Sequence, residues 1–118
     1  MKMTQRLVYL LLVIGLTASH GFSQNANSGE IKGTVADPTG AVIEGVTVTV
    51  ANVQTGVKTS LITNSNGIYD APSVPTGEYR ITFSKAGFRD LVRQGIKLEF
   101  GAITVDAELQ AGAARLSE

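Results

Sequence analysis

The residues that could carry out nucleophilic or metal-dependent chemistry are few in this sequence. The chain contains no cysteine, and its one histidine, His20, lies in an N-terminal segment that we interpret below as a cleaved export signal. Zinc sites and activated nucleophiles rely largely on cysteine and histidine. Asp106 and Glu108 alternate along one predicted strand, and we interpret them as solvated surface charges rather than a catalytic carboxylate pair. The sequence therefore predicts a protein that is not an enzyme and needs no cofactor.

Oxygen-rich and lysine-based sites receive a similar interpretation. Asn64, Asn66 and Asp70 carry oxygen ligands for calcium, but calcium sites usually gather more carboxylates, so a plain turn is the better interpretation. Lys32 is a candidate donor for an intramolecular isopeptide bond to asparagine, yet the segment 103–109 that would supply the acceptor contains no asparagine. We therefore predict no metal site and no such cross-link.

Aromatic side chains are the remaining candidates for ligand contact, because exposed rings stack on sugars. The chain has no tryptophan, and we expect most aromatic rings after residue 23 to lie in a core, where burial of each stabilises by roughly 1.5–3 kcal/mol. Phe88 and the hydroxyl ends of Tyr69 and Tyr79 are the only groups among them that could reach a ligand, and core is the better interpretation for all of these rings. Thr47 and Thr49 form an uncharged outward face that tolerates a neighbouring strand, so both are candidate partner contacts.

The elements that would position these residues begin with the stretch 31–50. In residues 46–50 valine alternates with threonine, which is the period-two pattern of a half-buried strand. Residues 37–40 read Asp-Pro-Thr-Gly and supply the chemistry of a tight turn. Gly33, inside the strand before this turn, indicates a bulge or a close approach of another backbone.

Further turns divide the rest of the chain into short segments without a helical period. We predict seven strands, at residues 30–36, 46–52, 57–63, 68–71, 79–85, 96–100 and 103–109. Seven short strands at near-regular spacing predict an all-β sandwich.

The alternation also assigns faces and ends to the later strands. The positions predicted to face inward in the fifth and sixth strands are Tyr79, Ile81, Phe83, Ile96, Leu98 and Phe100. Pro72 and Pro75 are expected to end the fourth strand, and residues 89–95 are expected to form a polar connection.

The first 23 residues have the layout of a secretory signal peptide. Lys2 and Arg6 precede an apolar run at 7–16, which is shorter than the roughly 20 residues of a membrane-spanning helix. We predict a helical signal peptide cleaved after Ser23, or alternatively after Gly21; an uncleaved anchor helix is the other interpretation. The predicted units are a signal peptide at 1–23, a flexible leader at 24–29, a β-sandwich at 30–109 and a disordered tail at 110–118.

Five short motifs follow one another along the chain. They are Ile31-x-Gly33-x-Val35-x-Asp37-x-x-Gly40, Gly45-Val46-x-Val48-x-Val50, Thr63-Asn64-x-x-Gly67-x-Tyr69, Pro75-x-Gly77-x-Tyr79-x-Ile81-x-Phe83 and Ala86-Gly87-Phe88. This ordered set resembles the carboxypeptidase regulatory-like family, and the resemblance covers about residues 29–109. The resemblance implies a seven-stranded, Greek-key-type, transthyretin-like β-sandwich, without the zinc-binding catalytic part of the carboxypeptidases.

A signal peptide followed directly by such a domain is similar to the start of TonB-dependent-receptor-like (Oar-like) outer-membrane proteins. The resemblance implies an exported, non-catalytic interaction or spacer domain in the periplasm, or at the periplasmic face of the outer membrane, of a Gram-negative bacterium. Its partner would be a downstream transporter barrel or another protein. The alternative is a carbohydrate-binding module of starch-binding-like fold, with a glycan as ligand.

The charge of the chain limits its partners further. The formal net charge is zero, so no basic surface suggests nucleic acid or an anionic membrane as a partner. No pattern in the sequence indicates an oligomeric state.

Overall fold

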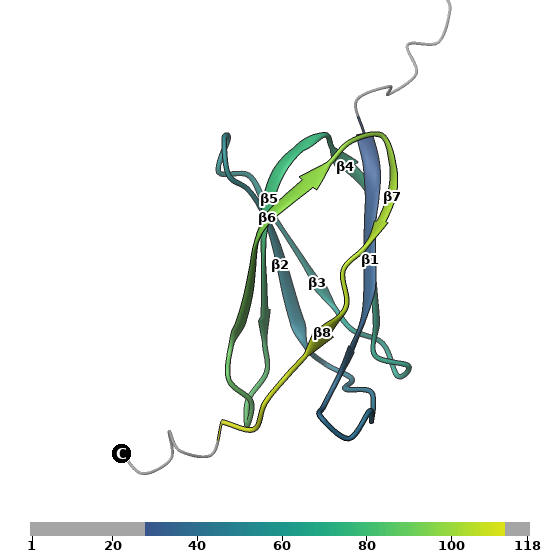
Figure 1. Ribbon diagram of the computed structural model, residues 1–118, viewed down its shortest axis with the longest axis vertical. Helices are drawn as coiled ribbons and strands as arrows, with labels where there is room; N and C mark the ends of the chain where they lie inside the picture. The colour runs from purple at the N-terminus through teal and green to yellow at the C-terminus, as the bar shows by residue number, and fades with distance from the viewer. Residues whose placement is uncertain (1–27, 113–118) are drawn as a thin grey trace, which may run out of the picture.

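The computed structural model describes residues 28–112, which form two β-sheets packed face to face (Figure 1). One sheet has the order β4-β1-β7, with β8 pairing farther along β1, and the other has the order β3-β2-β5-β6. The strands are β1 (Ser28–Ala36), β2 (Thr47–Asn52), β3 (Lys58–Ile62), β4 (Ile68–Pro75), β5 (Gly77–Ser84), β6 (Leu91–Leu98), β7 (Gly101–Thr104) and β8 (Ala107–Glu108). No helix in this part of the chain is long and apolar enough to cross a membrane. The prediction of an all-β sandwich is confirmed.

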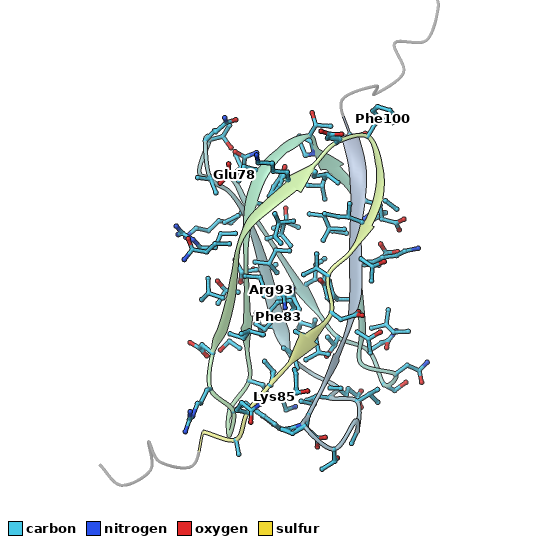
Figure 2. All side chains as sticks on the ribbon, in the orientation of Figure 1. Glu78, Phe83, Lys85, Arg93 and Phe100 are labelled. Carbon is cyan, nitrogen blue, oxygen red and sulfur yellow. The ribbon has the colours of Figure 1, made fainter. Side chains whose placement is uncertain are left out.

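Strands β2 and β5 lie in the middle of their sheet and show the strictest alternation. Val48 pairs with Phe83 and Val50 pairs with Ile81, and these four side chains are buried. Their neighbours along each strand, including Thr47, point to the outer face. Figure 2 places Phe83 between the two layers. The inward positions predicted for this strand pair are therefore confirmed.

In the sheet that contains β1, the backbone around Val105 approaches β1 closely. Gly33 leaves no room for a side chain, because a Cβ atom there would lie 2.0 Å from the carbonyl oxygen of Val105. The chain after β7 uses this space, and the N–H of Val105 donates to the carbonyl of Lys32 at 2.8 Å. Both β7 and β8 run parallel to β1. The close backbone approach expected at Gly33 is confirmed.

The predicted bounds of the sixth strand are wrong. β6 begins at Leu91, so most of the segment 89–95 belongs to a strand and not to a polar connection. Its pairing with β5 shifts register between Tyr79 and Ile81, and Gly95 lies at this irregularity with φ of 72°. An extra residue of this kind interrupts the alternation of inward and outward side chains. The first half of β6 therefore cannot be recognised as a strand from alternation alone.

Phe100 does not face the core, contrary to the prediction. β6 ends at Leu98, and Phe100 lies in the turn to β7 with 83% of its surface exposed. Figure 2 shows its ring at the end of the molecule where β1 begins. The alternation continues only while a strand continues. Here β6 has already ended, and the chain turns into β7 at its first residue, Gly101, which has a φ of 99°.

Three further boundaries differ from the prediction. β4 continues through Pro72 to Pro75, because an edge strand that pairs with β1 alone tolerates proline. The last predicted strand is divided into β7 and β8. β1 begins at Ser28, inside the predicted leader, and Ala111, inside the predicted tail, forms a bridge with Phe88. The predicted signal peptide lies outside the described residues.

Candidate functional site

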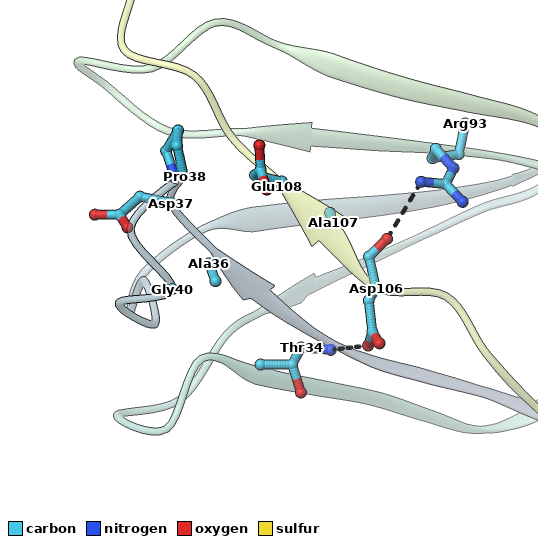
Figure 3. A pocket seen from close by; sticks show the side chains of 9 residues that line it. All are labelled: Thr34, Ala36, Asp37, Pro38, Gly40, Arg93, Asp106, Ala107 and Glu108. Atoms are coloured by element: carbon cyan, nitrogen blue, oxygen red, sulfur yellow. Dashed lines mark hydrogen bonds between the residues drawn. The ribbon is translucent and has the colours of Figure 1, made fainter.

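An open cleft lies where the end of β1, the middle of β6 and the β7–β8 segment meet (Figure 3). Its volume is about 450 Å³, and we call it the acidic cleft. It is lined by Thr34, Ala36, Asp37, Pro38, Gly40, Arg93, Asp106, Ala107 and Glu108. Three carboxylates and one guanidinium are the groups in it that could act chemically, so their hydrogen bonds decide what the cleft can do.

Asp106 lies between β7 and β8, where the chain leaves the β1 ladder. Its Oδ1 accepts a hydrogen bond from the N–H of Thr34 at 2.8 Å, and its carbonyl oxygen accepts one from Nη1 of Arg93 at 3.4 Å. Figure 3 shows both contacts. The carboxylate therefore replaces the backbone acceptor that a continuous strand would offer to β1. Asp106 is exposed, as predicted, but it also has this structural role.

Asp37 is engaged within its own turn. Its Oδ1 accepts hydrogen bonds from the hydroxyl and the N–H of Thr39, at 2.6 and 2.9 Å, and from the N–H of Ala41 at 3.1 Å. The bond from the Thr39 hydroxyl, supported by the backbone donors, lowers the pKa of the Asp37 carboxyl. A general acid needs a raised pKa at neutral pH, so Asp37 is suited to holding the turn and not to donating a proton.

Glu108 completes the acidic cleft. Its Oε1 accepts a hydrogen bond from the side-chain amide of Gln110 at 3.0 Å, and the residue is exposed. Each of the three carboxylates thus accepts a hydrogen bond from another residue of the domain. The carboxylates of the acidic cleft therefore act as hydrogen-bond acceptors that hold the surrounding turns and strand ends.

A smaller pocket lies on the opposite side of the sandwich, between the edges of β3 and β4. Its volume is about 190 Å³, and we call it the side pocket. It is lined by Val50, Asn52, Thr55, Val57, Thr59, Ser73, Val74, Pro75 and Tyr79. The hydroxyl of Tyr79 donates to the carbonyl of Pro75, so this polar end is already occupied. What remains is a mostly apolar hollow beside two strand edges.

Asn52 forms the other polar end of the side pocket. Its Oδ1 accepts hydrogen bonds from the N–H groups of Gln54 and Thr55, both at 2.9 Å. This is the local bond by which asparagine organises a turn, here the one between β2 and β3. The polar atoms at both ends of the pocket therefore serve the fold, and its capacity for binding rests on its apolar surface and its shape.

Side chains suited to metal binding do not cluster within residues 28–112. This part of the chain contains no group of three or more histidine, cysteine, aspartate or glutamate residues that could hold a metal ion. Asn64, considered for calcium, instead accepts hydrogen bonds from the N–H groups of Asn66 and Ile68, at 2.9 and 3.0 Å. Asn64 therefore uses its side-chain oxygen to hold the turn before β4.

Lys32 lies on the outer face of β1. Its Nζ is 3.9 Å from a carboxylate oxygen of Glu30, and both side chains are partly exposed. The pKa of Glu30 is raised, chiefly because its carboxyl hydrogen-bonds the carboxyl of Asp70. This small group of charges is a surface feature of the β1–β4 pair, open to solvent.

The comparison with known families agrees with the fold. Residues 30–110 match the family model described as the carboxypeptidase regulatory-like domain. The chain belongs to the carboxypeptidase regulatory-like domain family. It is also similar to the TonB-dependent transporter Oar of Myxococcus xanthus, with 34% identity over 104 residues. That alignment covers 83% of this chain and 9% of the relative, so the chain spans a small part of the length of the transporter that it matches.

Solved structures agree on the fold of this carboxypeptidase regulatory-like domain. Catechol 1,2-dioxygenase of Acinetobacter radioresistens matches with a TM-score of 0.61 at 16% identity, covering 75% of this chain and 53% of that one. A proposed carbohydrate-binding protein of Bacteroides uniformis matches with a TM-score of 0.58 at 18% identity, covering 69% and 40%. An enzyme and a proposed sugar-binding protein thus share this fold, which by itself does not identify a function.

The four contact residues predicted from the sequence do not form one site in this regulatory-like domain. Tyr69 is 2% exposed, and its hydroxyl donates to the carbonyl of Val105, so the interpretation of this ring as part of the core is confirmed and its polar end is engaged inside the domain. Phe88 is half-buried beside Ala111 in the turn after β5. Thr47 is exposed and Thr49 half-buried on the outer face of β2, where their contact with a partner stays a prediction.

No motif in the sequence indicates the side pocket. Its walls come from the inward side of β3 and from the second half of β4, which the prediction had excluded from the strand. The only feature of the sequence that could have indicated a longer β4, and with it the pocket, is Val74 between Pro72 and Pro75. A valine there is compatible with a loop or with a proline-containing edge strand, and only the pairing with β1 decides between them.

Proposed function

We propose that this chain is an exported, non-catalytic β-sandwich that serves as an interaction or spacer domain of an outer-membrane TonB-dependent-type transporter, on the periplasmic side. The alignment with the Myxococcus xanthus transporter carries the proposal, because it includes most of this chain at 34% identity. It accounts for a small fraction of the transporter, as expected for one accessory domain of a large membrane protein.

The absence of catalysis has independent support in the described part of the chain. Residues 28–112 contain neither histidine nor cysteine. The carboxylates of the acidic cleft, Asp37, Asp106 and Glu108, are engaged in hydrogen bonds that hold turns and strand ends. A metal-dependent hydrolase activity of the purified chain would contradict this assignment.

The association with a transporter is tested on the native gene product. An antibody raised against the domain is used to follow the protein through membrane fractionation, and its intact mass is then measured. We expect an outer-membrane species much larger than the domain. A soluble periplasmic species with the mass of residues 24–118 would contradict the association. N-terminal sequencing of either species also tests cleavage after Ser23 against cleavage after Gly21.

Carbohydrate binding is the second candidate function, and one observation favours it. Phe100 exposes 83% of its surface, although most aromatic rings of this domain, including Phe83 and Tyr79, are buried. A single exposed ring gives weaker stacking than the platforms of several rings typical of sugar-binding modules. Calorimetric titration with starch-like and cell-wall glycans tests this function, and binding that is lost in Phe100→Ala would support it. Absence of heat with all of these glycans would exclude it.

A further inference from the structure

The outer strands of the sandwich are not equally protected against pairing with another strand. β4 carries Pro72 and Pro75, which lack backbone donors. β6 carries the charged residues Arg93 and Lys97 and the irregularity at Gly95. On the β7–β8 side the ladder is interrupted, and Asp106 fills the interruption. All three edges thus have features that natural sheets use to prevent edge-to-edge association.

β3 has only one of these features, a charged residue at its first position. It reads Lys-Thr-Ser-Leu-Ile from Lys58 to Ile62, without proline, glycine or a register shift, and among the strands of residues 28–112 it pairs with β2 alone. Its single charge lies at its first residue. At its other end, Ile62 exposes 69% of its surface on the outer face. A regular edge that is uncharged from its second residue onward is a template for another strand.

The register of the β2–β3 pair identifies the backbone groups at this edge. Asn52 N–H donates to the carbonyl of Val57, and Thr63 N–H donates to the carbonyl of Val46. In an antiparallel ladder such bonded pairs recur at every second residue, so Thr59 and Leu61 are bonded to β2. The N–H and C=O groups of the alternate residues therefore point to the open edge. These residues are Lys58, Ser60 and Ile62.

The side pocket lies beside the same edge, on the inward side of β3. Thr59 lines it and is exposed, although its partner Val50 is buried, because no strand of the described chain covers this side. A strand added to β3 would place alternate side chains above the pocket, whose volume is about 190 Å³. An apolar cavity of roughly 150 Å³ accommodates a benzene-sized group, so the pocket has room for one large side chain.

We propose that β3 pairs in antiparallel fashion with β3 of a second copy of this chain, centred on Ser60. This register is the one that overlaps all five residues of both strands, and it places Lys58 of each copy opposite Ile62 of the other. The two lysines lie at opposite ends of the ladder and do not repel each other directly. Thr59 faces Leu61 of the second copy, which brings an aliphatic side chain to the mouth of each side pocket.

The alternation of faces is preserved in this arrangement. Ser60 would lie opposite Ser60 of the second copy on the outer face, while Thr59 and Leu61 would lie on the inner face. A shift by one residue would exchange the faces, and a shift that centres the ladder on Lys58 would place like charges opposite each other. The residues of β3 thus select one self-pairing register. This proposal does not depend on the association with a transporter.

The expected dimer is weak. A ladder of five residues on each side is smaller than the roughly 800 Å² per partner of a standard interface, so association is expected only at high local concentration. Two chains held at one membrane would meet that condition more readily than two chains free in solution, because tethering raises their effective concentration.

A cysteine at the centre of the ladder tests the register, since the chain has no cysteine of its own. Directly opposed, bonded residues of antiparallel strands have Cα atoms about 5.5 Å apart, which lies inside the range that a disulfide accepts. The Ser60→Cys variant of the full chain, exported and purified in reduced form, is treated with a mild oxidant. We expect cross-linked dimers to form about tenfold faster than in the Val92→Cys variant, which reports random collision at another exposed edge.

The ends of the ladder provide the register control. Lys58→Cys alone should cross-link slowly, because its copies lie at opposite ends, whereas a mixture of Lys58→Cys with Ile62→Cys should form the mixed dimer rapidly. Equal rates for Ser60→Cys and Val92→Cys would overturn the proposal. Rapid cross-linking of Lys58→Cys alone would overturn the register.

Sedimentation equilibrium of the unaltered chain gives an independent measurement. We expect the average mass to rise toward that of a dimer between about 10 μM and 1 mM, the range of weak association. Ser60→Pro removes the central donor at the open edge without removing a bond to β2, so it should stay monomeric with an unchanged circular dichroism spectrum. A parent chain that is monomeric throughout, or a folded Ser60→Pro chain that associates equally, would overturn the proposal.

Discussion

The two lateral sides of this sandwich are closed in different ways. On one side, the segment after β6 returns along β1, and Val105 and Leu109 donate backbone hydrogen bonds to it. Asp106 fills the remaining position by accepting from Thr34. We call this the closed side. On the other side, β3 and β4 end in two edges with the side pocket between them, and we call this the open side.

This difference separates what the chain uses for stability from what it can offer to a partner. Backbone bonds and a buried tyrosine hydroxyl hold the closed side, so substitutions there remove buried interactions. Side chains on the open side are largely exposed, including Thr59 and Ser73, so substitutions there should change binding more than folding. The following predictions test this contrast, beginning with the largest expected effect.

Gly33→Ala should be the most destabilising substitution on the closed side. A Cβ atom at residue 33 would lie 2.0 Å from the carbonyl oxygen of Val105, and this oxygen belongs to the backbone, so it cannot move aside like a flexible side chain. We expect a loss of about 3 kcal/mol in the free energy of unfolding, measured with urea. Ser73→Ala, on the open side, is the matched control and should change it by less than about 0.5 kcal/mol. Equal effects would contradict the contrast.

The hydroxyl groups of two tyrosines allow the closed and open sides to be compared by removing a single oxygen atom from each. Tyr69→Phe removes the hydroxyl that donates to the carbonyl of Val105 in the core, and we expect a loss of about 1–2 kcal/mol in unfolding free energy. Tyr79→Phe removes a similar bond to Pro75 in the partly buried wall of the side pocket, and its effect should be smaller. Urea unfolding of both variants measures the difference, and a larger effect for Tyr79→Phe would reverse the assignment of the two sides.

The burial of Tyr69 also predicts a dependence on alkaline pH. Burial raises the pKa of this phenol well above that of an ordinary tyrosine, with the charge of Asp106 contributing in the same direction. Above pH of about 10 the unfolded chain loses this proton while the folded chain keeps it, so stability should fall as pH rises. Urea unfolding between about pH 8 and pH 11, a range that brackets the ordinary pKa of tyrosine, measures this fall in the free energy of unfolding. Tyr69→Phe should show less of it, and identical slopes would exclude Tyr69 as the cause.

Asp106→Ala should have an intermediate effect on the closed side. It leaves the N–H of Thr34 without its acceptor, and because this bond is near the surface, water replaces part of the loss. We expect a decrease of about 1 kcal/mol in unfolding free energy. Glu108→Ala, in the same acidic cleft, removes an exposed contact with Gln110 and should be close to neutral. An equal loss in both variants would indicate a general charge effect.

Thr59→Val should have the smallest effect, because it keeps the shape of an exposed side chain on the open side. The residue lines the side pocket, and its bonds to β2 are made by the backbone. We expect a change within about 0.5 kcal/mol in unfolding free energy. The same variant should leave Ser60→Cys cross-linking intact, since an aliphatic residue at position 59 still accommodates Leu61 of the second copy. A loss above 2 kcal/mol, about the size of a core substitution, would mean that the open side is packed.

The candidate sites were less predictable from the sequence than the strands. Asp106 and Glu108 are exposed as expected, but nothing in their spacing indicates that Asp106 bonds to residue 34, which is distant in sequence. The core position of Tyr69 was predictable, but the sequence also left its polar end as a candidate ligand contact, and only the structure shows that this hydroxyl donates to a carbonyl inside the core. The side pocket depends on two edges that are brought together only when the sheets pack.

The sequence by itself determined the strands whose side chains alternate strictly, since one buried face requires that pattern in β2 and β5. It also determined the turn at Asp37, where local hydrogen bonds suffice. Only the tertiary structure decided the course of β6 and the exposure of Phe100, because a bulge and a strand end interrupt the alternation. It likewise decided which edge stays open, because pairing is a relation between distant strands and no single strand encodes its neighbours.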